Sequence, residues 1–236
     1  FAEKYGPGGA FHEGPEGYLR ETGAPWKEKT VEAIRALTKE FGAVLIYDEV
    51  KTGFRFARGG AAEFFGVTPD LATYAKAIGN GYPAAAFGGR RDIMSQLPDK
   101  VSHGGTYAGN RVAAAAAVKT LEIIRDTNAL ETIHATGRRI QDGLRTALDA
   151  SGLPYQFTGH PSMFGVMFTD KEVTEYRDWA DTDHDLYDAI AVAMQARGAM
   201  PEPDSREPWF ICEDHATGDT VDRVVTIFSE ALDAVL

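Results

Sequence analysis

The sequence predicts an α/β domain built on a mostly parallel β-sheet, followed by a smaller α+β domain. Residues 28–41 have helical spacing of apolar side chains, and an apolar run of strand length follows at residues 43–47. A continuously apolar strand after a helix indicates a parallel sheet with helices on both faces. From about residue 155 the short strands and helices no longer alternate strictly. These elements fit a separate small domain that begins with the helix at 130–150, and we therefore divide the chain into 1–129 and 130–236.

In the first domain, residues 28–41 carry apolar side chains three and four positions apart, which predicts a helix, and Gly42 is a suitable C-cap. The apolar run at 43–47 ends in Asp48 and is the strongest strand candidate. The other expected elements are, in order, strands at 71–75 and 84–87, a short helix at 92–97, a glycine-rich loop at 101–110 and a helix at 111–125.

The second domain combines helical patterns with short strand-like segments. The expected elements are, in order, a helix at 130–150, strands around 157 and at 163–168, a helix at 185–197, a strand at 209–212 and a last helix from 220. This mixture predicts an α+β arrangement.

Composition restricts the classes of partner. A hydrophobic content of 44% and a charged content of 25% are typical of a globular protein in water. No uninterrupted apolar stretch of about 18 residues predicts a membrane span. The net charge of −11 and the absence of a basic run disfavour a nucleic-acid partner.

The chain termini and cysteine usage point to a cytoplasmic protein. Cys212 is the only cysteine, so no internal disulfide forms, which fits a reducing compartment. The sequence shows no charged-then-apolar stretch at its start, so nothing in it predicts secretion. The chain begins at Phe1, without a methionine, in a glycine-rich stretch, and we interpret it as lacking upstream residues.

Asp48 and Lys76 end two successive strand-like runs. Ligands of open parallel sheets bind beyond the carboxyl ends of the strands. Taken alone, Asp48 is better interpreted as a surface acid and Lys76 as a solvated lysine. Together they suit pyridoxal phosphate (PLP), which needs a lysine for its Schiff base and an acid that keeps its pyridine nitrogen protonated. The turn at 79–81 leaves room for such a ligand.

Three blocks of sequence resemble the class III PLP-dependent aminotransferases. They are residues 45–55 (LIYDEVKTGFR), residues 68–83 around Lys76, and residues 103–110 (HGGTYAGN), in the order and at the spacing of that family. Residues 88–94 are most similar to the glutamate-1-semialdehyde aminomutase branch. The resemblance implies the large PLP-binding domain of fold type I, in part, followed by the small C-terminal domain.

The resemblance assigns roles to four residues. It implies that Lys76 forms the Schiff base, that Asp48 pairs with the pyridine nitrogen, and that Val50 packs on one ring face. Thr106 would contact the cofactor phosphate of the neighbouring subunit in a homodimer; without the resemblance, a capping role for this hydroxyl is the better interpretation. The family's phosphate loop and the aromatic that stacks on the other ring face lie upstream of Phe1.

Arg206 is a further candidate, for a substrate carboxylate, because a guanidinium binds a carboxylate with two parallel hydrogen bonds. An ion pair with Asp204 or Glu207 is an equally good interpretation. The histidines show no metal-binding spacing, so we assign no metal.

The resemblance implies an aminotransferase that moves an amino group from an amine or amino acid donor to an oxo acid or aldehyde, both small molecules. Two alternatives stay open. One is a glutamate-1-semialdehyde-type aminomutase, which moves the group within one substrate. The other is a non-catalytic or partial subunit that needs a separate N-terminal half.

Overall fold

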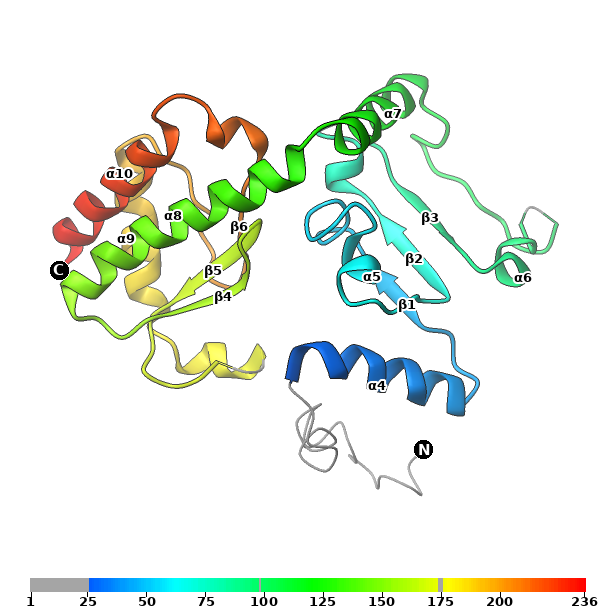
Figure 1. Ribbon diagram of the computed structural model, residues 1–236, viewed down its shortest axis with the longest axis horizontal. Coiled ribbons are helices and arrows are strands. Elements are labelled where there is room, and N and C mark those ends of the chain that lie inside the picture. Colours follow the sequence, from blue (N-terminus) through cyan, green and yellow to red (C-terminus); the bar gives the residue numbers. More distant parts are fainter. Residues whose placement is uncertain (1–25, 98, 174–175) are drawn as a thin grey trace. The chain divides into compact units, whose positions relative to one another are not determined.

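The computed structural model describes residues 26–97, 99–173 and 176–236, which form two compact units (Figure 1). The first unit ends at Asp126 and the second begins at Thr127, where we predicted a boundary between residues 129 and 130. The glycine-rich stretch at the start of the chain lies outside the described residues.

The first unit holds a three-stranded sheet in the order β1-β2-β3. Strands β1 and β2 are parallel, and β3 is antiparallel to β2 (Figure 1). Helix α5 and the 3-10 helix η1 were not predicted. The elements are α4 (Trp26–Glu40), β1 (Ile46–Asp48), α5 (Gly60–Phe64), β2 (Leu71–Tyr74), η1 (Lys76–Ile78), β3 (Ala86–Gly89), α6 (Arg91–Met94) and α7 (Arg111–Asp126).

Gly42 ends α4 as the sequence predicts. Its φ of 63° lies in the left-handed region, and its N–H donates to the carbonyl of Lys39. The Ala43 N–H donates to the carbonyl of Thr38, so these two carbonyls of the last helical turn are satisfied. The chain then turns directly into the approach to β1.

The burial of β1 differs from the sequence prediction. We expected an apolar strand covered on both faces, but Val44 is 49% exposed and Ile46 is 55% exposed. The strand itself begins only at Ile46. In the described part of the first unit, few hydrophobic side chains are buried at all: Leu45, Val67, Ala72, Ile78 and Ala113.

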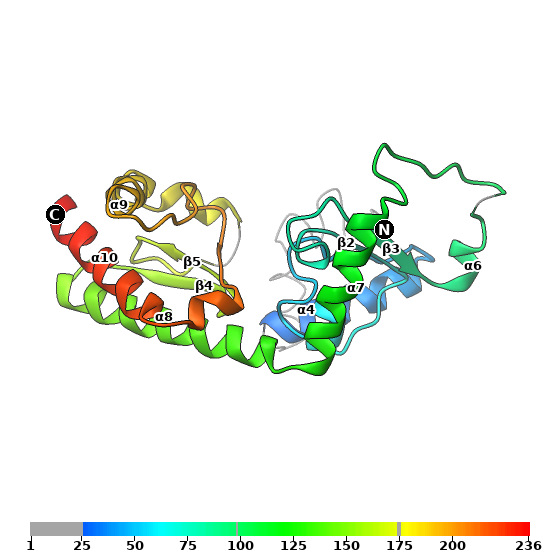
Figure 2. The same ribbon diagram turned by 90° about the horizontal axis from the view of Figure 1, so that it is seen from above.

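The second unit is an α+β arrangement with its own antiparallel sheet, in the order β4-β5-β6. Helix α10 lies between α8 and α9 and packs against both (Figure 2). The elements are α8 (Ala129–Ser151), β4 (Gln156–His160), β5 (Met163–Met167), η2 (Tyr176–Asp181), α9 (His184–Ala196), β6 (Trp209–Phe210), η3 (Glu213–Ala216) and α10 (Thr220–Val235).

One hydrophobic cluster holds the second unit together. It combines side chains of α8, β5, α9 and α10, and members such as Leu144, Phe164, Phe228 and Leu232 are at most 2% exposed. The rings of Phe164 in β5 and Trp209 in β6 lie 5.7 Å apart, and the Trp209 ring lies 6.4 Å from that of Phe228 in α10, which joins the strands to that helix. Burial of these apolar surfaces is the main stabilising contribution in the second unit.

Candidate active site

The pairing of β1 with β2 brings the two principal candidates to one edge of the sheet. Asp48 is the last residue of β1 and lies in register with Thr73 of β2. Lys76 follows Thr73 by three residues, at the start of η1. Because the strands are parallel, their carboxyl ends meet at the same edge. Figure 1 shows these two strand ends side by side.

Asp48 presents its carboxylate to the open side of the strand end. The side chain is exposed, and its Oδ1 accepts a hydrogen bond from the Val50 N–H at 3.0 Å. The Thr73 hydroxyl lies 3.4 Å from the same oxygen. Val50, in the turn that follows, therefore helps to orient Asp48. Two neutral donors fix the direction of the carboxylate without neutralising it.

Lys76 has an unusual backbone conformation. Its φ is +49°, whereas Ala75 before it is fully extended with a φ of −155°. A side chain with a Cβ in the left-handed region is strained, and such strain concentrates at functional sites. Gly79 then ends η1 in a crowded turn, where a Cβ would lie 2.3 Å from the Tyr82 carbonyl oxygen. The chain thus reverses sharply just after Lys76.

Thr106 lies in an exposed turn shortly before α7. The residue that caps this helix is Asn110, whose Oδ1 accepts hydrogen bonds from the N–H groups of Val112 and Ala113, both at 3.0 Å. The capping role that we considered for Thr106 therefore belongs to Asn110. A contact between Thr106 and a cofactor phosphate stays a prediction.

Asp70 organises the opposite end of the same two strands, a role that the sequence analysis missed. Its buried carboxylate accepts from the Leu45 N–H at 2.8 Å and forms ion pairs with Arg35 at 2.9 Å and Arg90 at 3.0 Å. The backbone hydrogen bond from Leu45, followed by the bonds from the arginines, lowers the pKa of Asp70 to about 2. In the sequence, the available signal for this role was the position of Asp70 directly before a strand-like run.

Glu49 is the second acid that the sequence analysis left without a role. It follows Asp48 directly, and only 1% of its surface is exposed. A charged residue inside the core is rare unless its hydrogen bonds are satisfied. The available sequence signal was the pair of acids, Asp48 and Glu49, directly after an apolar strand.

Arg206 lies in the second unit, in a close pair with Asp204. Its Nη2 is 2.5 Å from Asp204 Oδ2, and its Nε is 2.9 Å from Oδ1. The guanidinium also lies over the Trp179 ring, 4.8 Å from its centroid. The hydrogen bonds from Arg206 lower the pKa of Asp204 to about 2. The structure shows the ion pair that the sequence suggested, and carboxylate recognition by Arg206 stays a prediction.

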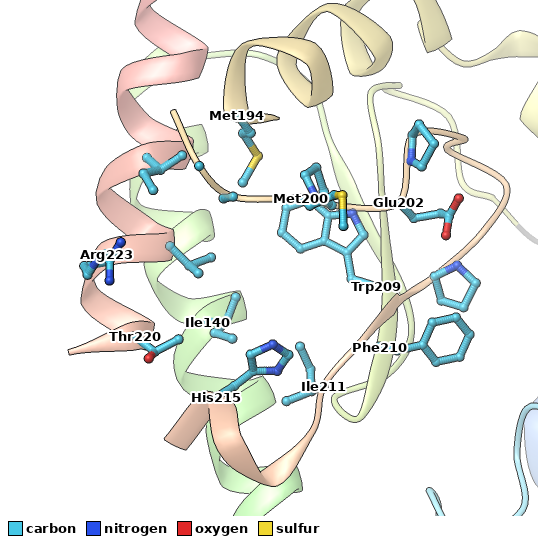
Figure 3. Close-up of a pocket in the computed structure, with 17 residues that line it drawn as sticks. Ile140, Met194, Met200, Glu202, Trp209, Phe210, Ile211, His215, Thr220 and Arg223 are labelled. Carbon is cyan, nitrogen blue, oxygen red and sulfur yellow. The ribbon is translucent and has the colours of Figure 1, made fainter. Parts of the chain in front are cut away.

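A cavity of about 660 Å³ lies within the second unit and contains none of the candidate cofactor residues. Figure 3 shows its largely apolar lining around Met194, Met200 and Trp209, with His215 reaching into it from η3.

The described part of the chain offers neither a metal site nor a membrane span. Among those residues, no group of three or more His, Cys, Asp or Glu side chains is arranged to hold a metal ion. None of the helices in the described part of the chain is both long enough and apolar enough to span a bilayer.

The sequence matches the family described as aminotransferase class-III over residues 21–228. The chain belongs to this family. It is 41% identical over 210 residues to the glutamate-1-semialdehyde 2,1-aminomutase of Neisseria meningitidis serogroup C / serotype 2a, and 40% identical over 210 residues to that of Neisseria gonorrhoeae. Each of these alignments covers 88% of this chain and 49% of the relative. The resemblance to the aminomutase branch is thereby confirmed. The chain spans about half the length of these relatives.

Solved structures confirm the predicted fold class, part of the fold-type I PLP-dependent transferases. The PLP internal aldimine form of the FumI protein from Sphingopyxis sp. MTA144 has a TM-score of 0.78 at 30% identity, covering 90% of this chain and 48% of FumI. An omega-transaminase from Sphaerobacter thermophilus has a TM-score of 0.75 at 26% identity, with coverages of 90% and 49%. A glutamate-1-semialdehyde-aminomutase from Pseudomonas aeruginosa PAO1 has the same fold, with a TM-score of 0.77 at 22% identity and the same coverages.

Proposed function

We propose that the protein is a PLP-dependent enzyme that moves an amino group, with Lys76 as the residue that binds the cofactor covalently. The observation that carries this proposal is the parallel register of β1 and β2, which places Asp48 and Lys76 at one sheet edge. Membership of the class III family and the strained backbone at Lys76 support it.

The residues at this edge suit the cofactor. When bound, PLP supplies a protonated pyridine ring that acts as an electron sink. The exposed Asp48 carboxylate, fixed by the Val50 N–H and the Thr73 hydroxyl, is suited to hold a proton on the ring nitrogen. Val50 follows in the adjacent turn, and we assign it to one face of the ring.

Lys76 has two tasks in this proposal. Its amine first holds the cofactor covalently and is released when the amine of a substrate takes its place. The freed amine would then carry a proton from the substrate carbon to C4′ of the cofactor. Lysine suits proton transfer because its pKa falls readily near positive charge or away from water. The turn that begins at Lys76 is closed by hydrogen bonds from the Gly79 and Asn80 N–H groups to the Lys76 carbonyl, both at 3.1 Å.

Two reactions fit these residues. An aminotransferase passes the amino group from a donor to a separate oxo acid or aldehyde, and the likeness to an omega-transaminase supports this reaction. An aminomutase moves the group within one molecule, and the relatives at 40–41% identity favour this second reaction, from carbon 2 to carbon 1 of glutamate-1-semialdehyde.

The covalent role of Lys76 is tested by borohydride reduction of the PLP-loaded protein, followed by peptide mapping. We expect the pyridoxyl group on Lys76, and a yellow protein before reduction. Label on a different lysine would refute the assignment. A protein that takes up no PLP at all would support the alternative of a non-catalytic partner subunit.

The two reactions are distinguished by their need for an acceptor. An aminomutase converts glutamate-1-semialdehyde into the isomer with the amino group on carbon 1 when no oxo acid is added. An aminotransferase stops after one half-reaction under the same conditions, with the cofactor left in its amine form. Product analysis with and without added oxo acid separates these outcomes.

We further propose that the protein works as a homodimer in which Thr106 contacts the PLP phosphate of the partner subunit. Dimers are the commonest closed assemblies, and the first unit leaves apolar side chains such as Tyr107 and Val112 exposed near Thr106. The test mixes Lys76→Ala subunits with Thr106→Ala subunits. Random exchange leaves about a quarter of the sites intact, so about a quarter of the activity should return. Proven exchange without any recovery would show that Thr106 serves its own subunit.

A further inference from the structure

Glu49 lies directly behind Asp48, and its carboxylate is fully enclosed by neutral donors. Its Oε2 accepts from the Ala61 N–H at 3.0 Å and from the Thr52 hydroxyl at 2.5 Å, and its Oε1 accepts from the Ala62 N–H at 3.0 Å. A buried carboxylate is costly unless such bonds satisfy it. The side chain therefore has one well-defined position.

The space around Glu49 is fitted to it by two glycines. A Cβ on Gly60, whose φ is +67°, would lie 2.6–2.7 Å from the carboxylate atoms. A Cβ on Gly53 would lie 2.7 Å from the Glu49 carbonyl oxygen, which accepts the Gly53 N–H at 2.9 Å. Both positions require glycine for the backbone to approach Glu49 this closely. We refer to Glu49, Thr52, Gly53, Gly60, Ala61 and Ala62 as the Glu49 socket.

The socket joins three pieces of the first unit: the end of β1, the turn that follows it, and the start of α5. The Glu49 N–H also donates to the Thr73 carbonyl at 2.9 Å, which extends the contact between β1 and β2 by one residue. Since successive residues of a strand point to opposite faces, Glu49 holds the strand end from the side opposite to Asp48.

The socket also fixes the donors that aim Asp48. Val50, whose N–H binds the Asp48 carboxylate, lies between Glu49 and Thr52, which are bonded to each other. Thr73, whose hydroxyl is the other donor, is bound through its carbonyl to the Glu49 N–H. A shift of Glu49 would therefore move both donors of Asp48 at once.

We propose that Glu49 is the positioning residue that aims Asp48 at the pyridine nitrogen of PLP, and that it acts through Val50 and Thr73 without touching the cofactor. This inference rests on the proposed function. At metal sites, replacing a residue that orients a ligand from behind typically changes affinity or activity about 10–100-fold, and we expect an effect of that order for Glu49.

The experiment replaces Glu49 with Gln in the PLP-loaded protein and measures the visible absorption of the bound cofactor against pH, together with its dissociation constant. The Gln amide turns a donor towards a backbone N–H of the socket, so the turn must shift. We expect covalent loading on Lys76 to persist, the absorption–pH curve to move, and PLP affinity to fall about tenfold. Thr52→Val, which removes one donor and keeps the charge, should move the same curve less and serves if Glu49→Gln does not fold.

Asp70→Asn is the matched control, because Asp70 is also a buried acid of this sheet but binds the opposite end of β1 and β2. It should lower thermal stability while leaving the absorption–pH curve in place. An unmoved curve for both Glu49→Gln and Thr52→Val, in protein that loads normally, would overturn the role of Glu49 alone. A curve that moves equally for Asp70→Asn at equal loss of stability would overturn it too. Wild-type protein that takes up no PLP would overturn the proposed function and this inference with it.

Discussion

Among the described residues, the first unit buries two carboxylates, Glu49 and Asp70, close to the strand ends, whereas the second unit buries a single cluster of sixteen hydrophobic side chains. The acids of the first unit satisfy backbone N–H groups and fix strand ends and turns. The apolar cluster of the second unit fixes helices against a sheet. Positioning in the first unit thus depends on directional hydrogen bonds, and cohesion in the second depends on buried area.

This difference implies that substitutions in the two units have different consequences. Exposed polar side chains at the strand ends of the first unit should affect chemistry without unfolding the protein. Buried apolar side chains of the second unit should affect stability while leaving the cofactor site loaded. The following experiments test that separation.

The largest effect is expected for Asp48→Ala. Removing the fixed charge that would hold a proton on the pyridine nitrogen should lower kcat roughly 10²–10³-fold, the usual loss when a preorganised electrostatic group is removed. The Asp48 side chain is exposed, and water can bind the two donors that it leaves, so the unfolding midpoint should hardly change. Steady-state kinetics, borohydride mapping of Lys76 and thermal unfolding provide the measurements. Asp48→Asn keeps the shape and should lose nearly as much activity. Near-normal turnover of Asp48→Ala would make Asp48 a structural acid.

Leu144→Ala tests the second unit in the opposite way. Leu144 of α8 is fully buried, and its truncation leaves a cavity that should cost about 2–5 kcal/mol of unfolding free energy. Hydrogen exchange of amides in the second unit measures this loss locally. The matched control is Val192→Ala on α9, which is 65% exposed and should change stability by less than about 0.5 kcal/mol. Loss of covalent cofactor loading in folded Leu144→Ala protein would contradict the separation of the two units.

The sequence predicted the elements of both units well because their periodic patterns are local. The helices α7, α8 and α9 begin and end within one residue of the expected positions, α10 begins at the expected residue 220, and Gly42 caps α4 as predicted. The missed elements, α5, η1, η2 and η3, are six residues long or shorter. Such short elements carry too few residues for a periodic pattern.

The candidate site was only partly predictable. Asp48 and Lys76 were found because each ends a strand-like run, and a parallel pairing of those runs puts them at one edge. The role of Glu49 depends on Ala61 and Ala62, about a dozen residues away along the chain, and no local pattern reveals that contact. The exposure of Ile46 was also not predictable from a local pattern. An apolar run shows which side chains favour burial, but it does not show which parts of the chain cover them.

Arg206→Ala tests whether the second unit contributes to chemistry at all. If Arg206 binds a substrate carboxylate, its loss should lower kcat/KM for an amino acid about 10–100-fold, corresponding to about 1.5–3 kcal/mol, and change that for the decarboxylated amine little. The control is Asp204→Asn, which weakens the existing ion pair and should favour the amino acid. Equal losses for both substrates would show that Arg206 and Asp204 only stabilise the second unit.

The smallest expected effect is a difference between the units on mild acidification. Burial, followed by the nearby His134 and Arg138, lowers the pKa of His160 in the second unit from 6.5 to about 4. Its Nδ1 accepts the Ser162 N–H at 3.2 Å, which requires the neutral ring. Because unfolding lets this histidine take up a proton, its contribution to stability is complete above pH 6.5 and declines as the pH falls towards 4.

Asp70 in the first unit behaves differently, because its pKa is lowered from 3.8 to about 2. Its contribution is complete above pH 3.8 and is lost only as the pH falls towards 2. Between pH 7 and pH 5 the second unit should therefore open more readily, while the Asp70 contacts of the first unit keep their full contribution. Hydrogen exchange resolved by peptide at the two pH values, corrected for intrinsic exchange rates, measures this. His160→Gln should reduce the acid sensitivity of the second unit. If that variant and the wild type lose protection equally, the ionisation of other groups governs the second unit, and His160 is not its acid-sensitive residue.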